Sequence, residues 1–277
     1  MNTTRKTFFL TGSARGLGRS IAETILDAGH NLVATARRPQ QLDDLVARHG
    51  ARILPLALDV TDFDAASAAM KTGIQAFGRI DVVINNAGYG SIGSVEDMPV
   101  QAIADLMRTN FLGSVNVIKA ALPALREQQA GRIIQVSSIG ARIGVPGAAA
   151  YFASKWAISG FLESLAMEVA PLGIHVTAVE PAGMKTDFAD DSSLTVHPSQ
   201  TAYDATAGAV AAMMKAPNYG DDYAEPADIA AVILKVAALN YPPVRMLLSR
   251  SSWDLAKAAE TARIAADDAW QALATSV

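Results

Sequence analysis

Apolar and polar positions alternate along the chain at two different periods. Short runs that are apolar throughout, such as Thr7–Thr11 and Asn31–Ala36, are followed by longer stretches with apolar residues at helical spacing, such as Leu17–Ala28. Continuous apolar runs of this length predict strands buried on both faces, and the stretches between them predict crossover helices. The pattern therefore predicts a doubly wound, mostly parallel α/β sheet of about seven strands with helices on both faces.

The predicted elements follow one another in chain order. We expect strands at 7–11, 31–36, 52–58, 80–84, 131–136, 174–179 and 244–248, and helices at 17–28, 40–49, 62–77, 99–128, 149–170, 226–239 and 251–274. The alternation stops at 184–225, which begins polar and becomes alanine-rich, and we interpret this segment as an inserted substrate lid. We see no repeat or linker, so residues 1–277 are predicted to form a single domain.

Composition narrows the class of protein. Of 277 residues, 51% are apolar and 18% charged, and the formal charge of −4 argues against nucleic acid or an anionic membrane as the main partner. The lack of cysteine excludes thiolate catalysis and disulfides, and the four scattered histidines predict no metal site. The apolar run Phe8–Leu10 is too short for a signal peptide core or a membrane span, so cytoplasmic residence is the default expectation.

A glycine-rich turn follows the first strand. The run Thr11-Gly-Ser-Ala-Arg-Gly-Leu-Gly18 opens a predicted helix, and glycine lets backbone amides approach a pyrophosphate closely. The spacing, Gly-x-x-x-Gly-x-Gly, differs from the usual dinucleotide fingerprint. A turn that starts a helix and binds nothing is the alternative. We predict a nucleotide contact through Gly12, Arg15, Gly16, Leu17 and Gly18.

Arginines mark the end of the second predicted strand. An acidic residue there often holds the ribose of NAD(H), whereas arginine suits the 2′-phosphate of NADP(H). Here Arg37 and Arg38 follow the strand, with Arg15 in the neighbouring turn, so NADP(H) is favoured over NAD(H). A solvated helix start is the alternative for Arg37 and Arg38. Asp59-Val60, after the third strand, is predicted to contact the adenine, although Asp59 could equally belong to a helix cap, as could Thr61 or Asp62.

Tyr151 and Lys155 stand four residues apart, so they share one face of a predicted helix. An ammonium group one turn away favours the phenolate and would bring proton transfer by the tyrosine nearer to neutral pH. Ser137 and Ser138 lie just upstream. Each residue also has an ordinary explanation: a core tyrosine, a surface lysine or a turn serine.

Together with Asn85-Asn86-Ala87-Gly88, these motifs occur in an order that strongly resembles the short-chain dehydrogenase/reductase family. The chain resembles its single-domain branch with Gly-x-x-x-Gly-x-Gly, and within it most closely the subgroup with 17β-hydroxysteroid dehydrogenase-like enzymes. The match runs from about Lys6 to Met246. Departures are Ala182, where glycine is frequent, and Ser249-Arg250 near the last strand. The resemblance implies a Rossmann fold and an NADP(H)-dependent carbonyl reductase or alcohol dehydrogenase.

The resemblance also implies roles for individual residues. Tyr151 would be the acid/base, and Ser138, which precedes it at the family's usual gap, would bind the substrate oxygen. Lys155 would hold the nicotinamide ribose, and Asn110 would hold a water that extends a proton relay, although an asparagine inside a helix could be a simple polar defect. The implied cofactor contacts further along are Asn86, Ala87, Gly88, Pro181, Gly183 and Thr186.

The substrate is only broadly defined by the sequence. We expect an apolar pocket lined by Ile92, Ser138, Ile143, Val145, Met184 and Phe188, and therefore a small to medium apolar ketone, aldehyde or secondary alcohol. Arg142 is the one charged neighbour, and a position facing solvent is the alternative for it. The resemblance implies a homodimer or homotetramer through the helices 100–128 and 149–170. The alternatives are an epimerase or dehydratase on the same scaffold, or a non-catalytic NADP(H)-binding regulator.

Overall fold

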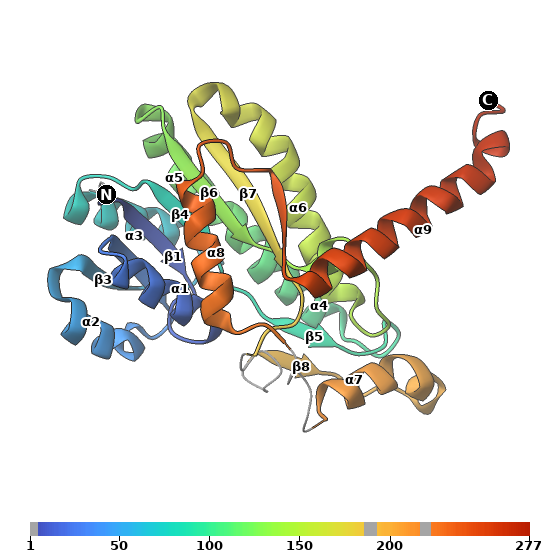
Figure 1. The fold of residues 1–277 in the computed structure, drawn as a ribbon. Coiled ribbons are helices and arrows are strands. Elements are labelled where there is room, and N and C mark those ends of the chain that lie inside the picture. The colour runs from blue at the N-terminus through green and yellow to red at the C-terminus, as the bar shows by residue number, and fades with distance from the viewer. Residues whose placement is uncertain (1–4, 186–192, 217–222) are drawn as a thin grey trace.

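A computed structural model describes residues 5–185, 193–216 and 223–277 (Figure 1). Seven strands form one sheet in the order β3-β2-β1-β4-β6-β7-β9, and every neighbouring pair is parallel. The strands are β1 (Thr7–Thr11), β2 (Asn31–Ala36), β3 (Ile53–Ala57), β4 (Val82–Asn85), β6 (Gly131–Val136), β7 (Ile174–Pro181) and β9 (Arg245–Leu248). The chain starts in the middle and winds outward in both directions, which confirms the predicted doubly wound fold.

Helices cover both faces of the sheet (Figure 1). On one face the core is built with α1 (Gly16–Asp27), α2 (Asp43–His49) and α8 (Pro226–Ala238), and on the other with α3 (Phe63–Phe77), α5 (Gly113–Glu127) and α6 (Ala149–Val169). Side chains alternate between the faces of a strand, so Phe8 packs in the first cluster and Phe9 in the second. Burial on both faces explains why these strands are apolar throughout.

The predicted long helix 99–128 is interrupted. It consists of α4 (Val100–Met107), a π-helical turn at Arg108–Leu112, and α5. A π-helical turn adds a residue without ending the helix, so the apolar spacing on either side still reads as one helix. The predicted helix is therefore confirmed in its extent, but it contains a π-helical turn at Asn110 that was not predicted.

Part of the predicted lid forms a second small sheet with the loop after β4. In it, β8 (Leu194–Val196) pairs in parallel with β5 (Gly90–Ile92), and neither strand was predicted. The His197 amide donates to the Ile92 carbonyl at 2.7 Å, and the Tyr203 hydroxyl to Glu96 at 2.5 Å. A short helix, α7 (Ala209–Met214), follows. The described part of 184–225 is thus attached to the loop beyond the carboxyl end of β4.

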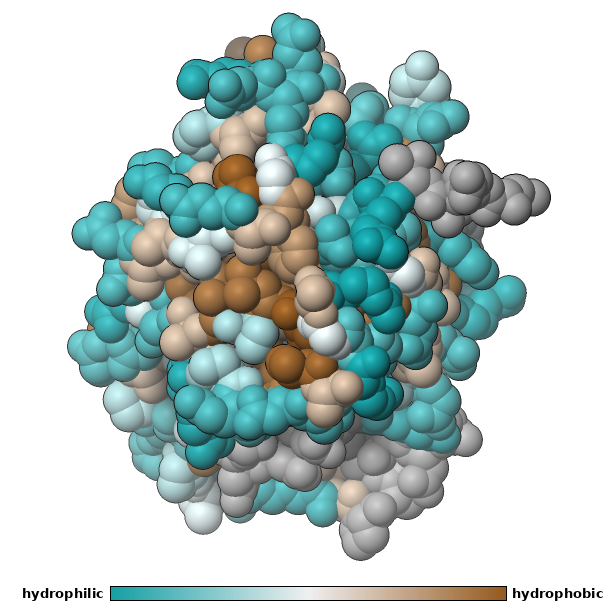
Figure 2. All heavy atoms as spheres, turned by 90° about the vertical axis from the view of Figure 1, so that its left-hand side faces the viewer, coloured by the Kyte–Doolittle hydropathy of each residue, from teal (hydrophilic) through white to brown (hydrophobic). Residues whose placement is uncertain are grey.

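The two ends of the sheet differ. At the β3 edge, the face that Figure 2 shows, hydrophobic atoms gather near the centre among hydrophilic ones. Pro55 lies in this edge strand and cannot donate a backbone hydrogen bond, which limits pairing with another strand.

Beyond β9, the helix α9 (Arg250–Ala274) projects away from the body (Figure 1). None of the described helices is long and apolar enough to cross a membrane.

Candidate active site

The glycine-rich turn connects β1 to α1 and depends on its glycines. Gly12 and Gly16 have φ values of +67° and +51°, in the left-handed region that other residues avoid. At Gly18 a Cβ atom would stand 2.0 Å from the Gly12 carbonyl oxygen, so any side chain there would displace the turn. Leu17 is buried, and Arg15 occupies the N-cap position of α1 with extended backbone. The helix N-terminus therefore opens onto a backbone cradle.

Hydrogen bonds fix this turn to the end of β4. The Thr11 hydroxyl accepts from the amides of Asn86 and Ala87 at 2.9 and 3.0 Å. In return, Asn86 Nδ2 donates to the carbonyls of Thr11 and Gly12, both at 3.1 Å. Two segments predicted to bind the same nucleotide are thus held side by side by side-chain-to-backbone contacts.

The cradle continues toward the predicted catalytic residues. Gly88 is exposed, and a Cβ atom there would lie 3.0 Å from Asn110 Oδ1 and 4.0 Å from Lys155 Nζ. Pro181 ends β7 and is buried, and Gly183 packs beneath the ring of Tyr223, which a Cβ would approach to 2.2 Å. Thr186, also predicted to contact the cofactor, lies outside the described residues. The turn, the β4 end and the β7 end each place a glycine where a side chain would clash with neighbouring protein atoms.

The predicted phosphate arginines lie at the outer end of this cradle. The Ser13 amide donates to the Thr35 carbonyl at 3.0 Å, so the glycine turn adjoins the end of β2, where the exposed Arg37 and Arg38 follow. Asp59 is exposed and Val60 buried. The pKa of Asp59 is lowered by hydrogen bonds from the Thr61 amide and hydroxyl and by the charge of Arg37. The cap of α3 is Asp62, which accepts from the Ala65 amide at 2.9 Å.

Ser138, Tyr151 and Lys155 converge at the carboxyl end of the sheet. Ser138 follows β6, and its hydroxyl accepts from the Gly140 amide at 3.0 Å. Tyr151 and Lys155 share one face of α6, with Lys155 Nζ 5.7 Å from the centre of the Tyr151 ring and 3.1 Å from the Val136 carbonyl that receives its hydrogen bond. Ser138 lies beside Tyr151 and acts to lower the pKa of its phenol. The Ser137 hydroxyl instead forms a hydrogen bond with the Ser159 hydroxyl, with the two oxygens 3.0 Å apart.

Burial shifts the titration of both α6 residues. It raises the pKa of Tyr151 to about 12, although the hydrogen bond with Ser138 opposes the rise, and it lowers the pKa of Lys155 to about 8. The expected lowering of the tyrosine pKa is therefore not found: desolvation is the largest cause, and the Lys155 ammonium group donates its hydrogen bond to the Val136 carbonyl. At neutral pH the tyrosine holds a proton that it can donate.

Asn110 is fully buried in the π-helical turn. Its Oδ1 accepts from the Tyr89 amide at 3.1 Å, and its Nδ2 donates to the Tyr89 carbonyl at 2.9 Å and to Ser154 Oγ at 3.1 Å. Ser154 in turn donates to the Tyr151 carbonyl at 2.6 Å. Sequence reasoning did not single out Ser154, although its place directly before Lys155 was a usable signal. Asn110 and Ser154 thus join the loop after β4 to α6.

The predicted pocket residues are only partly brought together. Ile92 and Val145 pack in one apolar cluster with Phe152 and Leu194, whereas Met184 packs on the α1 and α8 side of the sheet. Ile143 is half-buried, and Phe188 lies outside the described residues. Phe152 and Leu194 were missed, because a residue beside Tyr151 and one on the lid gave no distinguishing pattern.

Arg142 is half-buried and does not face solvent, which was the alternative left open for it. Its Nε donates to the fully buried Glu180 at 2.5 Å, and its Nη1 donates to Glu260 of α9 at 2.5 Å. The sequence could not decide between the two positions, because both carboxylates are distant in sequence from Arg142.

Comparison with known proteins identifies the family. The sequence profile described as "short chain dehydrogenase" matches residues 6–197. The chain belongs to the short-chain dehydrogenase/reductase family. It is an oxidoreductase, as the family resemblance implied; the finer placement among 17β-hydroxysteroid dehydrogenase-like enzymes stays a prediction.

Individual relatives agree with this assignment over nearly the whole chain. Oxidoreductase BOA17 of Botryotinia fuckeliana is 45% identical over 269 residues, covering 97% of each chain. The crystal structure of a short-chain dehydrogenase from Streptomyces avermitilis superposes with a TM-score of 0.91 at 30% identity over 100% of both chains. A structure of an ElxO variant with NADPH bound has a TM-score of 0.74 at 25% identity, covering 88% of this chain and 96% of the other.

Proposed function

We propose that this short-chain dehydrogenase/reductase uses NADP(H) to interconvert an apolar ketone or aldehyde and the corresponding alcohol, with Tyr151 as the acid/base. The observation that carries the proposal is the convergence of Ser138, Tyr151 and the buried Lys155, whose Nζ lies 5.7 Å from the centre of the Tyr151 ring. When bound, the nicotinamide supplies or accepts the hydride. The protein residues orient the substrate and manage its proton.

Each residue has a task that follows from its position. In reduction, the Ser138 hydroxyl donates a hydrogen bond to the substrate oxygen as negative charge develops there. Tyr151, whose raised pKa keeps it protonated, gives that oxygen its proton. Lys155 would hold the nicotinamide ribose, and Asn110 would help to return a proton to Tyr151. In oxidation the same groups act in reverse.

Preference for NADP(H) is supported by three arginines at the outer end of the cradle, Arg15, Arg37 and Arg38, where a guanidinium fork suits a phosphate dianion. The NADPH bound in the ElxO variant is consistent with it. Two of the predicted pocket residues, Ile92 and Val145, lie in an apolar cluster, which supports an apolar substrate. The segment 184–225 would act as its lid.

The test is NADPH oxidation by the purified protein across a panel of ketones, aldehydes and quinones. We expect turnover with NADPH above that with NADH, and a loss of roughly 10²–10⁴-fold in Tyr151→Phe, which removes the acid group but keeps the ring. Faster turnover with NADH would overturn the cofactor preference. Binding of NADPH without any turnover would favour the regulator, and a cofactor retained through purification would favour the epimerase or dehydratase.

We also propose that the chain forms a homodimer or homotetramer through the segments 100–128 and 149–170. Large apolar side chains on these segments are exposed: Met167 of α6 is 74% exposed, and Leu112, the last residue of the π-helical turn before α5, is 49% exposed. Such residues are expected where a second chain covers them.

A further inference from the structure

Glu180 is a buried charge to which the proposed reaction assigns no task. Among the charged side chains that the structure describes, only Lys155 and Glu180 are buried, at 6% and 0% exposure. An isolated carboxylate is costly to bury, so its partners must be close and well oriented. Glu180 is the penultimate residue of β7, directly before Pro181 of the predicted cofactor segment.

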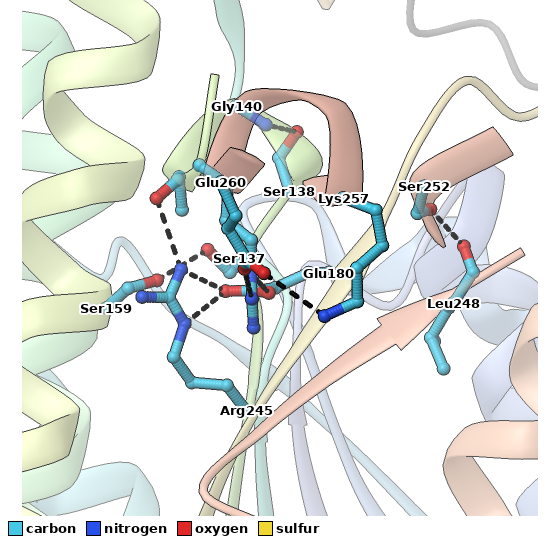
Figure 3. A network of polar contacts seen from close by, with 12 residues as sticks. Ser137, Ser138, Gly140, Ser159, Glu180, Arg245, Leu248, Ser252, Lys257 and Glu260 are labelled. Atoms are coloured by element: carbon cyan, nitrogen blue, oxygen red, sulfur yellow. Dashed lines mark hydrogen bonds and ion pairs between the residues drawn. The ribbon is translucent and has the colours of Figure 1, made fainter. Parts of the chain in front are cut away.

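Two arginines from different parts of the chain, Arg142 and Arg245, share this carboxylate, and Figure 3 shows Arg245 beside Glu180. Oε1 accepts from Arg245 of β9, at 2.7 Å from Nε and 2.6 Å from Nη2, and Oε2 accepts from Arg142 Nε at 2.5 Å. Arg142 also bonds Glu260, and Arg245 Nη1 reaches Glu163 of α6 at 2.9 Å. Both carboxylate oxygens of Glu180 are therefore paired.

Both arginines hold the turn that carries Ser138. The short 3₁₀ helix Ile139–Ala141 follows Ser138, whose hydroxyl caps it through the Gly140 amide. Arg245 Nη2 donates to the Ala141 carbonyl at 3.1 Å, and Arg142 is the next residue. Glu180 thus fixes the far end of this turn to the strand that leads into the predicted cofactor segment.

Stability alone is a poor reason for such a network. Buried ion pairs can often be replaced by well-packed apolar side chains without loss of stability. A group that must meet the substrate oxygen within a fraction of an ångström, in contrast, needs a rigid support. We propose that Glu180, acting through Arg142 and Arg245, is a positioning residue for Ser138; this rests on the role of Ser138 in the proposed function.

The test is a double-mutant cycle between Glu180→Gln and Ser138→Ala, read in kcat and in the KM for NADPH. Ser138→Ala is expected to lower kcat roughly 10²-fold. Glu180→Gln alone should lower kcat roughly 10- to 100-fold, as a misplaced catalytic group does, with the KM for NADPH within about 2-fold of wild type because the glycine turn is untouched. In the Ser138→Ala background, Glu180→Gln should lower kcat by less than about a further 3-fold.

Glu163→Gln is the matched control. It also removes a carboxylate from Arg245, but this carboxylate is 51% exposed and does not contact Arg142 in the described network, so kcat should be unchanged. If Glu180→Gln does not fold, Arg142→Gln replaces it in the cycle, since Glu180 then keeps Arg245 as a partner.

The outcomes separate this inference from the proposed function. Equal losses from Glu180→Gln in both backgrounds, or no loss in either, would overturn the positioning role and leave the function standing. Full activity of Ser138→Ala would overturn the role of Ser138 itself, and the positioning role with it.

Discussion

Lys155 combines burial with a single backbone hydrogen bond, and this has a consequence for stability. Burial lowers its pKa from 10.5 to about 8, so the folded protein loses this proton at a lower pH than the unfolded chain. Below about pH 8 both states carry the ammonium group, and the folded state bears the full cost of burying it. Between pH 8 and 10.5 the unfolded chain binds more protons, so this residue makes the protein more stable as the pH rises.

We therefore expect the free energy of unfolding of the wild type to rise, relative to that of Lys155→Met, by up to about 1.4 kcal/mol per pH unit between pH 8 and 10. Chemical denaturation of both proteins at several pH values measures the difference. Tyr151, whose raised pKa acts in the opposite direction, does so only above pH 10. A difference that stays constant over this interval would mean that Lys155 keeps its ordinary pKa in the folded protein.

The sequence identified site residues where the motif consists of residues a few positions apart. Tyr151 and Lys155 are one helical turn apart, and the glycines of the first turn follow a strand and open a helix. The partners of Arg142 could not be identified this way, because Glu180 and Glu260 lie on other elements and meet it only in the folded chain. The titration of Tyr151 was also mispredicted, since spacing reveals the neighbouring charge but not the degree of burial.

Among the elements, the turn between β1 and α1 is packed closely around its glycines. In Gly18→Ala, the added methyl group would meet the Gly12 carbonyl at 2.0 Å and Asn86 Nδ2 at 2.5 Å. We expect a loss of roughly 1–3 kcal/mol in the free energy of unfolding, as overpacked sites show, together with weaker NADPH binding. Thermal unfolding and a fluorescence titration with NADPH measure these effects.

Gly160 provides the control within α6. A Cβ atom there meets nothing within 4 Å, and the residue has ordinary helical backbone. Gly160→Ala should therefore stabilise the protein by about 0.5–1 kcal/mol through helix propensity alone. If both substitutions lowered stability equally, the close approach at Gly18 would not be the cause.

Elements were predictable where hydrophobic periodicity continued over many residues. All seven strands of the main sheet lie where continuous apolar runs predicted them, because burial on both faces leaves few polar positions. The strands β5 and β8 were missed, because each is three residues long and is defined only by pairing with the other. The π-helical turn at Asn110 was missed because the helix continues through it.

At the scale of the whole molecule, the exposed apolar residues of α6 predict assembly. If Met167 is covered by a second chain, Met167→Glu should lower the molar mass in solution to that of a smaller species, because a buried unpaired carboxylate is costly. Light scattering after size-exclusion chromatography measures the mass, and Glu168→Gln, a neighbouring exposed site, is the control. A wild-type protein that already runs as a monomer of 29.0 kDa would contradict the prediction.

The outer part of α9 contributes little to the fold. All residues from 261 onward are exposed, whereas Ser252 and Ala256 are buried and Glu260 and Arg263 contact Arg142. Truncation after Ala265 should change Tm by less than about 2 °C, because it removes no buried side chain. Truncation after Ala258 also removes Glu260 and Arg263 and should lower Tm and kcat. A large loss from the shorter truncation would mean that another chain covers the outer helix.

The contacts between Thr11 and Asn86 have a consequence for the kinetics of cofactor binding. These side chains already hold the glycine turn against the end of β4. This part of the protein therefore loses little conformational entropy when a dinucleotide binds. Association would then be governed by diffusional encounter and by the charge at the cradle mouth. Discrimination between the phosphorylated and unphosphorylated cofactor would be expressed in their residence times.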